Sequence, residues 1–381
     1  MVDGQKSPGR PSFFHKPAPP GAAPPRPVAP PAPAPPTSPP PPASPPPPTP
    51  PDYRLAPPPG PSPNGPGAGP LRRPSFHGNG GTLFGIHVVN TLLTLVTLGI
   101  YYFWAKTRLR QYLFGQTQIE GDRFAYHGTG RELLLGTLKA VLVFGVPIFV
   151  LNVIRDVLDV GVLLKVGAGL ISAILLFVFF PIAMVGARRY RLARTSWRGI
   201  RFSFRGRVWD MMKIFILGTF LTGVTFGLYY PYFLVARQTF MVSHSYFGSE
   251  RFSFDGHGRD LFWPYVLAIL LTLPTLGLGW VWYVARKRRY FWDHTSFGPA
   301  RFACSVSGGP LLGLWAVNAL LLVLTLGLAW PWVRVRSIHF AFGNLALPGP
   351  LDLARIQQDA QRVSAMGEGL SGFFDSGFDL A

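Results

Sequence analysis

Two glycine-rich pieces beside histidines are the first residues in this chain whose types and spacing could do chemistry. HGNG at 77–80 and HGTG at 127–130 stand fifty residues apart, each just before an expected helix. Exposed backbone N–H groups at a helix start can bind a phosphate or a lipid headgroup. The alternative is a tight turn in which glycine supplies a positive φ. Because the chain has no Walker-type phosphate loop and no strand-linked GxGxxG, the turn is the better interpretation.

The other histidines and the acidic residues form no recognisable catalytic or metal-binding pattern. No HExxH motif and no HxxxH pair occurs, and the few Asp and Glu residues lie mostly in loops. The single cysteine, Cys304, excludes a disulfide framework and a multi-cysteine metal site, and we expect it to be a small buried residue. We therefore expect no enzyme activity, no metal and no cofactor.

Three polar residues inside apolar segments are the remaining candidates for function. Asn90 in VNTLLTL and Asn318 in VNALLLV occupy equivalent positions, and His87 lies three residues before Asn90. A polar amide in hydrocarbon costs free energy unless it is hydrogen-bonded. The simpler interpretation is a hydrogen bond between helices. The sharper one places these side chains in a polar pathway.

The elements that must position these residues come from one short pattern that occurs five times, each copy at the end of an apolar stretch. Most copies are fifty residues apart, and one spacing is longer, at 78 residues. Internal repeats of this kind determine the architecture before any single residue does. The signature residues of the repeat are Gly99, Trp104, Tyr112, Arg123, Gly227, Arg251, Gly277, Trp282, Arg301, Gly327 and Trp332.

Six apolar segments are each long enough to cross a bilayer, which needs about 20 residues. Aromatic residues and then basic residues follow several of them, which is the order expected at a membrane surface. Pieces that alternate in period two, such as RFAY at 123–126 and RFSF at 251–254, predict short β-hairpins. We therefore expect an all-α polytopic membrane protein of about six transmembrane helices in quasi-repeats of about 50 residues, with short interfacial β-hairpins. The segments are 83–104, 133–155, 161–186, 211–236, 261–285 and 311–333.

The side of the membrane on which each loop lies has two conflicting predictions. The loops 105–132, 187–210 and 286–310 carry most of the Arg and Lys, so the positive-inside rule favours ordinary alternating spans. However, loop 237–260 has the same RF.F signature as its neighbours, which predicts the same surroundings. That second prediction requires some segments to be re-entrant, with a break at the TLG sequences. We favour alternation on the charge distribution.

Composition divides the chain into three parts and limits its partners. Residues 1–74 form a proline-rich tail, which favours polyproline II and serves as a spacer or docks a protein partner. Residues 75–345 form the repeat-built transmembrane domain, and 346–381 a C-terminal tail. The formal net charge is +19, yet 48% of the residues are hydrophobic. Basic loops beside spans contact anionic lipid and set orientation, so we expect no nucleic acid partner.

The repeat resembles the YjgN-like family of bacterial inner-membrane proteins, a family of unknown function. The match rests on the stretch from FHGNGG to YHGTG at 76–130 and on the later RY…T…G..RF.F copies, and it covers about residues 75–345. It implies a multi-pass protein of the bacterial inner membrane and supplies no substrate or catalytic residues. Within that frame we expect transport or permeation of a small solute or lipid. The alternative is a non-catalytic envelope scaffold whose proline-rich tail docks a partner. The oligomeric state stays open.

Overall fold

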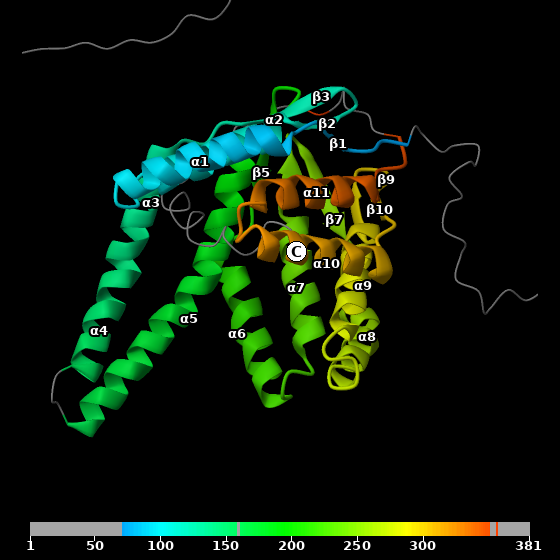
Figure 1. Ribbon diagram of the computed structural model, residues 1–381. Coiled ribbons are helices and arrows are strands. Elements are labelled where there is room, and N and C mark those ends of the chain that lie inside the picture. Colours follow the sequence, from blue (N-terminus) through cyan, green and yellow to red (C-terminus); the bar gives the residue numbers. More distant parts are fainter. Residues whose placement is uncertain (1–70, 158–160, 351–355, 357–381) are drawn as a thin grey trace, which may run out of the picture. The chain divides into compact units, whose positions relative to one another are not determined.

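The computed structural model describes residues 71–157, 161–350 and 356. The expected tails therefore lie almost entirely outside the described residues. Within them, pairs of helices alternate with pairs of short antiparallel strands along the chain (Figure 1). The strands gather in one place, and the helical hairpins extend away from them.

The strands form a nine-stranded antiparallel sheet in which each strand pairs with its neighbours in sequence. A tight turn joins the two strands of each hairpin, and each hairpin also pairs with the next across the intervening helices. A second, two-stranded sheet joins β10 and β11. The strands are β1 (Ser75–Phe76), β2 (Thr117–Ile119), β3 (Asp122–Tyr126), β4 (Thr195–Trp197), β5 (Ile200–Phe204), β6 (Ser245–Phe247), β7 (Glu250–Phe254), β8 (Thr295–Phe297), β9 (Ala300–Arg301), β10 (Ala303–Cys304) and β11 (Leu345–Ala346).

Four short helical hairpins each leave the sheet, turn at a TLG or TFG sequence and return to it. Their first helices have 13 or 17 residues, and their second helices 14 or 15. They are α1 (Gly80–Val96) with α2 (Tyr102–Gly115), α6 (Val208–Val224) with α7 (Tyr230–Ser243), α8 (Gly258–Leu270) with α9 (Gly279–Asp293), and α10 (Gly308–Leu324) with α11 (Trp330–Gly343).

One hairpin is much longer than the other four. Its first arm runs from Gly130 to Asp156, through α3 (Gly130–Ala140), a π-helical turn η1 (Val141–Gly145) and α4 (Val146–Asp156). Its second arm is the 32-residue helix α5 (Val162–Ala193). These two arms are the helices that are long and apolar enough to cross a membrane among the described residues. Figure 1 shows α4 and α5 meeting far from the strands.

The two ends of the described chain meet and close a ring of five units. Arg72 forms a β-bridge with Leu347, and β11 pairs with β10. Phe76 on β1 packs edge-on against His339 of α11, with 5.5 Å between the ring centroids. Between the other units, the strand hairpin is formed by residues that are consecutive in sequence. Between the last unit and the first, the first and last strands of the described chain take the place of that hairpin.

Glycine against an aromatic ring is the contact that repeats between units. A Cβ at Gly130 would lie 2.6 Å from the Trp104 ring, and one at Gly308 would lie 2.5 Å from the Trp282 ring. Gly80 meets Trp332 in the same way, at 2.4 Å, where the last unit contacts the first. These glycines start helices and have no positive φ. They are needed for close approach, which corrects our expectation of a positive-φ turn.

The expected all-α, six-span fold is wrong, and so is the alternation of loops. Four of the six apolar segments break at their TLG or TFG sequences into helices too short to cross about 30 Å of hydrocarbon. The loops expected on opposite faces join one sheet, because β5 pairs with β6 and β7 with β8. The residues of each turn are apolar, like the helices on either side. The hydrophobic pattern therefore could not show that each segment is two short helices and not one long helix.

Removing β11 tests the ring closure. We expect a chain ending at Asn344 to lose the buried Leu345 and Leu347 and the bridge to Arg72. Loss of two buried leucines costs at least about 3 kcal/mol, which corresponds to a melting temperature lower by roughly 6–12 °C. The control is a chain ending at Pro350, which keeps β11. Equal melting temperatures for the two purified chains in detergent would contradict the closure.

Candidate lipid-facing surface

The tip of each short hairpin presents a large apolar side chain to the surroundings. These tip residues, Leu98, Phe226, Leu276 and Leu326, are between 93% and 97% exposed. Each has a φ between 50° and 51°, a conformation that non-glycine residues seldom adopt. In water, an exposed apolar residue with a strained backbone would gain no hydrophobic stabilisation to offset the strain, and this residue is repeated in four hairpins. It fits a tip that lies in hydrocarbon.

Hydrogen bonds within each tip leave few backbone groups free. The glycine after the tip residue donates to a carbonyl five residues back, for example Gly99 to Thr94 and Gly327 to Leu322, both at 2.7 Å. A threonine before the tip then joins both helices. Thr325 Oγ1 donates to the Leu321 carbonyl at 2.6 Å and accepts from the Ala329 N–H at 2.9 Å. Satisfied backbone groups are what non-helical chain needs at membrane depth.

The flanks of the hairpins change from apolar to charged at a fixed distance from the tip. No charged residue lies within seven positions of any tip residue. An aromatic residue follows each tip by six positions, as Trp282 follows Leu276. Exposed arginines follow three of the tips by ten positions: Arg108, Arg286 and Arg336. The order of apolar tip, aromatic and cation matches the order from bilayer interior to headgroups.

The tip of the long hairpin differs because it is charged. Arg155 forms an exposed ion pair with Asp156, with 2.7 Å between the guanidinium nitrogen and the carboxylate oxygen. The arms have 27 and 32 residues, so they extend about 40 Å and about 48 Å. Hairpin length and tip polarity therefore vary together: short hairpins end in apolar residues, and the long one ends in charged residues.

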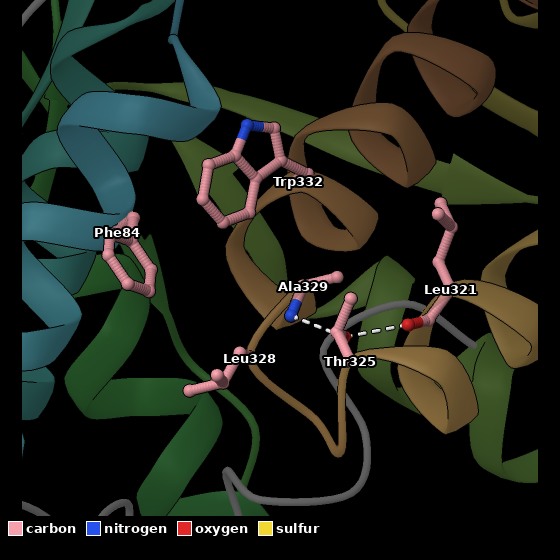
Figure 2. Close-up of a pocket in the computed structure, with 6 residues that line it drawn as sticks. All are labelled: Phe84, Leu321, Thr325, Leu328, Ala329 and Trp332. Atoms are coloured by element: carbon pink, nitrogen blue, oxygen red, sulfur yellow. Dashed lines mark hydrogen bonds between the residues drawn. The ribbon is translucent and has the colours of Figure 1, made fainter.

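An apolar groove of about 420 Å³ opens at the junction of the first and last units. We call it the seam groove (Figure 2). The rings of Phe84 of α1 and Trp332 of α11 are neighbours in its lining and are in contact, with 5.1 Å between their centroids. The Thr325 hydroxyl is already engaged in its own turn. The surface that lines the groove is almost entirely apolar. Its lining residues are Phe84, Leu321, Thr325, Leu328, Ala329 and Trp332.

An aromatic cluster fills the space enclosed by the strands. Trp197, Phe247 and Phe297 are the third residues of β4, β6 and β8, and all three are buried. Phe202 and Phe252 from the intervening strands complete a chain of ring contacts, such as Phe202–Phe247 and Phe252–Phe297, each at 4.7 Å. Ile356 packs against the same cluster. A polar solute would have to displace these rings to pass between the strands.

The structure places His87 and Asn90 on α1 of the first hairpin and Asn318 on α10 of the last. Asn90 is buried and its amide donates to the Ala105 carbonyl at 3.4 Å, between α1 and α2. Asn318 is buried and donates to Ser337 Oγ at 3.2 Å, between α10 and α11. His87 is exposed, with its ring 5.1 Å from Trp330. Each of these side chains therefore contacts a residue of a second helix, and none of these contacts joins one of the three to another.

The remaining signature residues have structural positions near the sheet. Tyr112 accepts a hydrogen bond from the Asn79 N–H at 2.8 Å, and Tyr290 accepts one from the His257 N–H at 2.6 Å, so each holds the start of the preceding helix. Burial, together with the hydrogen bond to Asp260, raises the pKa of Tyr290 above its ordinary range, so its hydroxyl stays a donor.

The signature arginines lie on the exposed side of the strands. Arg123 is exposed on β3, Arg251 donates to the Ser243 carbonyl, and Arg301 pairs with Asp255. Signature glycines Gly99, Gly227, Gly277 and Gly327 all have φ between 83° and 94° in the tip turns.

Sequence analysis missed the tip residues, the seam groove and the aromatic cluster. The cluster had a signal, because Trp197, Phe247 and Phe297 keep the same fifty-residue spacing as the signature residues. The tip residues had one too, since each directly precedes a signature glycine. The seam groove had none, because it joins residues from the two ends of the described chain.

Comparison with known proteins gives a family but no activity. Residues 72–281 and 263–373 match the profile of a family described as bacterial protein of unknown function (DUF898). The inner membrane protein YjgN of Escherichia coli K12 is 36% identical over 129 residues, and that of Salmonella typhimurium LT2 is 35% identical over 130 residues. Each match covers 34% of this chain and 30% of the relative, so the chain aligns with less than a third of those proteins. No solved structure matches the chain. The resemblance to the YjgN-like family is confirmed.

The threonine of the tip turn supplies a test of this surface. We expect Thr325→Val to leave the Ala329 N–H without its partner, at a cost of about 1–3 kcal/mol. In detergent this should lower the melting temperature by roughly 2–12 °C. Thr219→Val is the matched control, because Thr219 is exposed on α6. If both variants melt with the wild type, the turn does not depend on the hydroxyl.

Proposed function

The chain belongs to the DUF898 family of bacterial proteins of unknown function, and we propose that it is a non-catalytic inner-membrane protein that handles lipid. In this proposal the long hairpin crosses the bilayer, and the apolar tips of the short hairpins contact lipid. The observation that carries the proposal is the exposed apolar tip at the end of hairpins whose two ends are joined by antiparallel strand pairing.

The names of the relatives support the location. The aligned proteins are inner membrane proteins, and the alignment is consistent with the same membrane for this chain. Positive charge near the sheet supports a cytoplasmic sheet, since Arg and Lys concentrate on that side of bacterial spans. The exposed arginines Arg108, Arg286 and Arg336 fall at the level expected for anionic headgroups.

Lipid is the substrate class that the surfaces favour over a small polar solute. The aromatic cluster closes the space between the strands, and Asn90 and Asn318 are hydrogen-bonded within their own hairpins. The seam groove, in contrast, is open and apolar, and it continues toward the exposed Leu326 and Leu328. An unbranched acyl chain fits such a groove because it needs no hydrogen bond. We propose the seam groove as the site for the acyl chain of a membrane phospholipid.

A photoactivatable lipid tests this proposal. Full-length protein in native membranes is supplied with phosphatidylglycerol that carries a diazirine on its acyl chain, and crosslinked peptides are mapped by mass spectrometry. We expect labelling of the peptides that contain Phe84 and residues 321–332. Leu328→Trp should fill the groove and reduce that labelling at least about fivefold, because a bulky ring excludes the chain.

The control for this experiment is Leu228→Trp, the equivalent position in the α6–α7 hairpin, which should leave labelling at the seam unchanged. Equal labelling of all the hairpins, or labelling that Leu328→Trp does not reduce, would contradict a dedicated acyl-chain site.

A further inference from the structure

The aromatic cluster of the strands has a partly accessible surface. Trp197, Phe247 and Phe297 are buried, but rings that contact them, such as those of Phe202 and Phe252, are only half-buried. Half-buried aromatic rings favour an apolar cover, because removal of their remaining apolar area from water is stabilising. The cluster therefore offers a docking surface to an apolar side chain.

The chain's own C-terminal segment, residues 351–381, supplies such a side chain. The structure describes one residue of this segment, Ile356, and Ile356 packs against the cluster. The chain leaves the sheet close by, because a Cβ at Gly349 would lie 3.0 Å from the Ala300 Cα, and Ala300 is the strand partner of Phe297. Seven residues then bring the chain back to the cluster, over at most about 25 Å.

Charge favours the same occupant. The C-terminal segment contains five acidic residues and two arginines, a net charge of −3 in a chain whose total is +19. The strands present exposed arginines at equivalent positions of the repeat, and of these Arg301 already has Asp255 as an acidic partner. A segment that is acidic and anchored beside these strands is attracted to them. The arginines are Arg123, Arg201, Arg251 and Arg301.

We infer that the aromatic cluster is a docking site for the chain's own C-terminal segment, with Ile356 as the anchor and the acidic residues of the segment attracted to the exposed arginines of the strands. A single half-buried isoleucine is a small anchor, so the segment can leave the site. The segment is therefore a removable cover, and its release exposes the cluster. This inference is independent of the lipid proposal, because it uses neither the seam groove nor the hairpin tips.

Photocrosslinking in the full chain tests the docking. p-Benzoylphenylalanine replaces Ile356, the purified protein is irradiated in detergent, and the crosslinked peptides are mapped by mass spectrometry. We expect crosslinks within one chain to peptides that contain Trp197, Phe247 or Phe297. The same side chain at Val157, exposed at the tip of the long hairpin, is the control and should not reach these peptides. Crosslinks between two copies of the chain, or none to these strands, would overturn the docking.

Thiol accessibility in the full chain tests whether the segment covers the cluster. In a Cys304→Ser background, Ile200→Cys places a thiol at a half-buried residue of the cluster. Adding Ile356→Asn should speed its labelling by a soluble maleimide at least about fivefold, because the anchor is lost. Adding Ile356→Val, which keeps an apolar anchor, should leave the rate within about twofold.

A control and a salt series complete this experiment. Ser249→Cys, exposed at a strand turn, should label at the same rate with and without Ile356→Asn. Raising the salt concentration from about 50 mM to about 500 mM should speed the labelling of Ile200→Cys, because salt screens the attraction to the arginines. Equal rates for Ile200→Cys with and without Ile356→Asn would overturn the cover, and a rate that salt does not change would overturn the charge attraction.

Discussion

Antiparallel strand pairing between the two ends of each helical hairpin is the constraint on which the rest of the structure depends. Pairing of β1 with β2, β3 with β4, β5 with β6, β7 with β8 and β10 with β11 brings every hairpin back to the surface it left. A short hairpin that must return cannot expose a polar loop on the far side of a bilayer. Its turn must therefore be apolar and internally hydrogen-bonded, as it is at Leu98 and Leu326. Only the long hairpin escapes this requirement, and it alone has a charged tip among the described hairpins.

Closure of the ring then determines which surfaces remain exposed. Gly80 against Trp332 repeats the contact of Gly130 with Trp104, so the junction of the two chain ends is built like the other junctions. The strands enclose aromatic rings, which removes the space between them as a route for polar solutes. Apolar surface is left on the hairpin tips and in the seam groove. These surfaces are the basis on which we propose lipid as the partner.

Sequence reasoning recovered the local elements and failed at long-range pairing. The period-two pieces at 123–126 and 251–254 are strands, and the apolar segments are helical up to their turns. Hydropathy could not show that the chain reverses direction at Leu98 and Leu276, because both residues are apolar. Their positive φ cannot be predicted from residue type, since leucine seldom adopts it. Asn90 and Asn318 each donate a hydrogen bond to the neighbouring helix, and their partners, Ala105 and Ser337, depend on the turn that the sequence analysis missed. Trp197 and Phe247 follow the fifty-residue spacing, so the sequence could have identified them as equivalent positions. The spacing did not predict that strand hairpins so far apart in sequence would pair with each other.

Cysteine accessibility in intact cells tests the central claim, that the strand hairpins share one face, most directly. In a Cys304→Ser background, single cysteines replace Ser249 and Pro299, exposed at the turns of consecutive strand hairpins, and Val157, exposed at the long tip. A membrane-impermeant thiol reagent is applied before and after permeabilisation. The account predicts that Ser249→Cys and Pro299→Cys react only after permeabilisation, while Val157→Cys reacts before it. Labelling of Ser249→Cys and Pro299→Cys from opposite faces would contradict the single sheet and restore ordinary alternating spans.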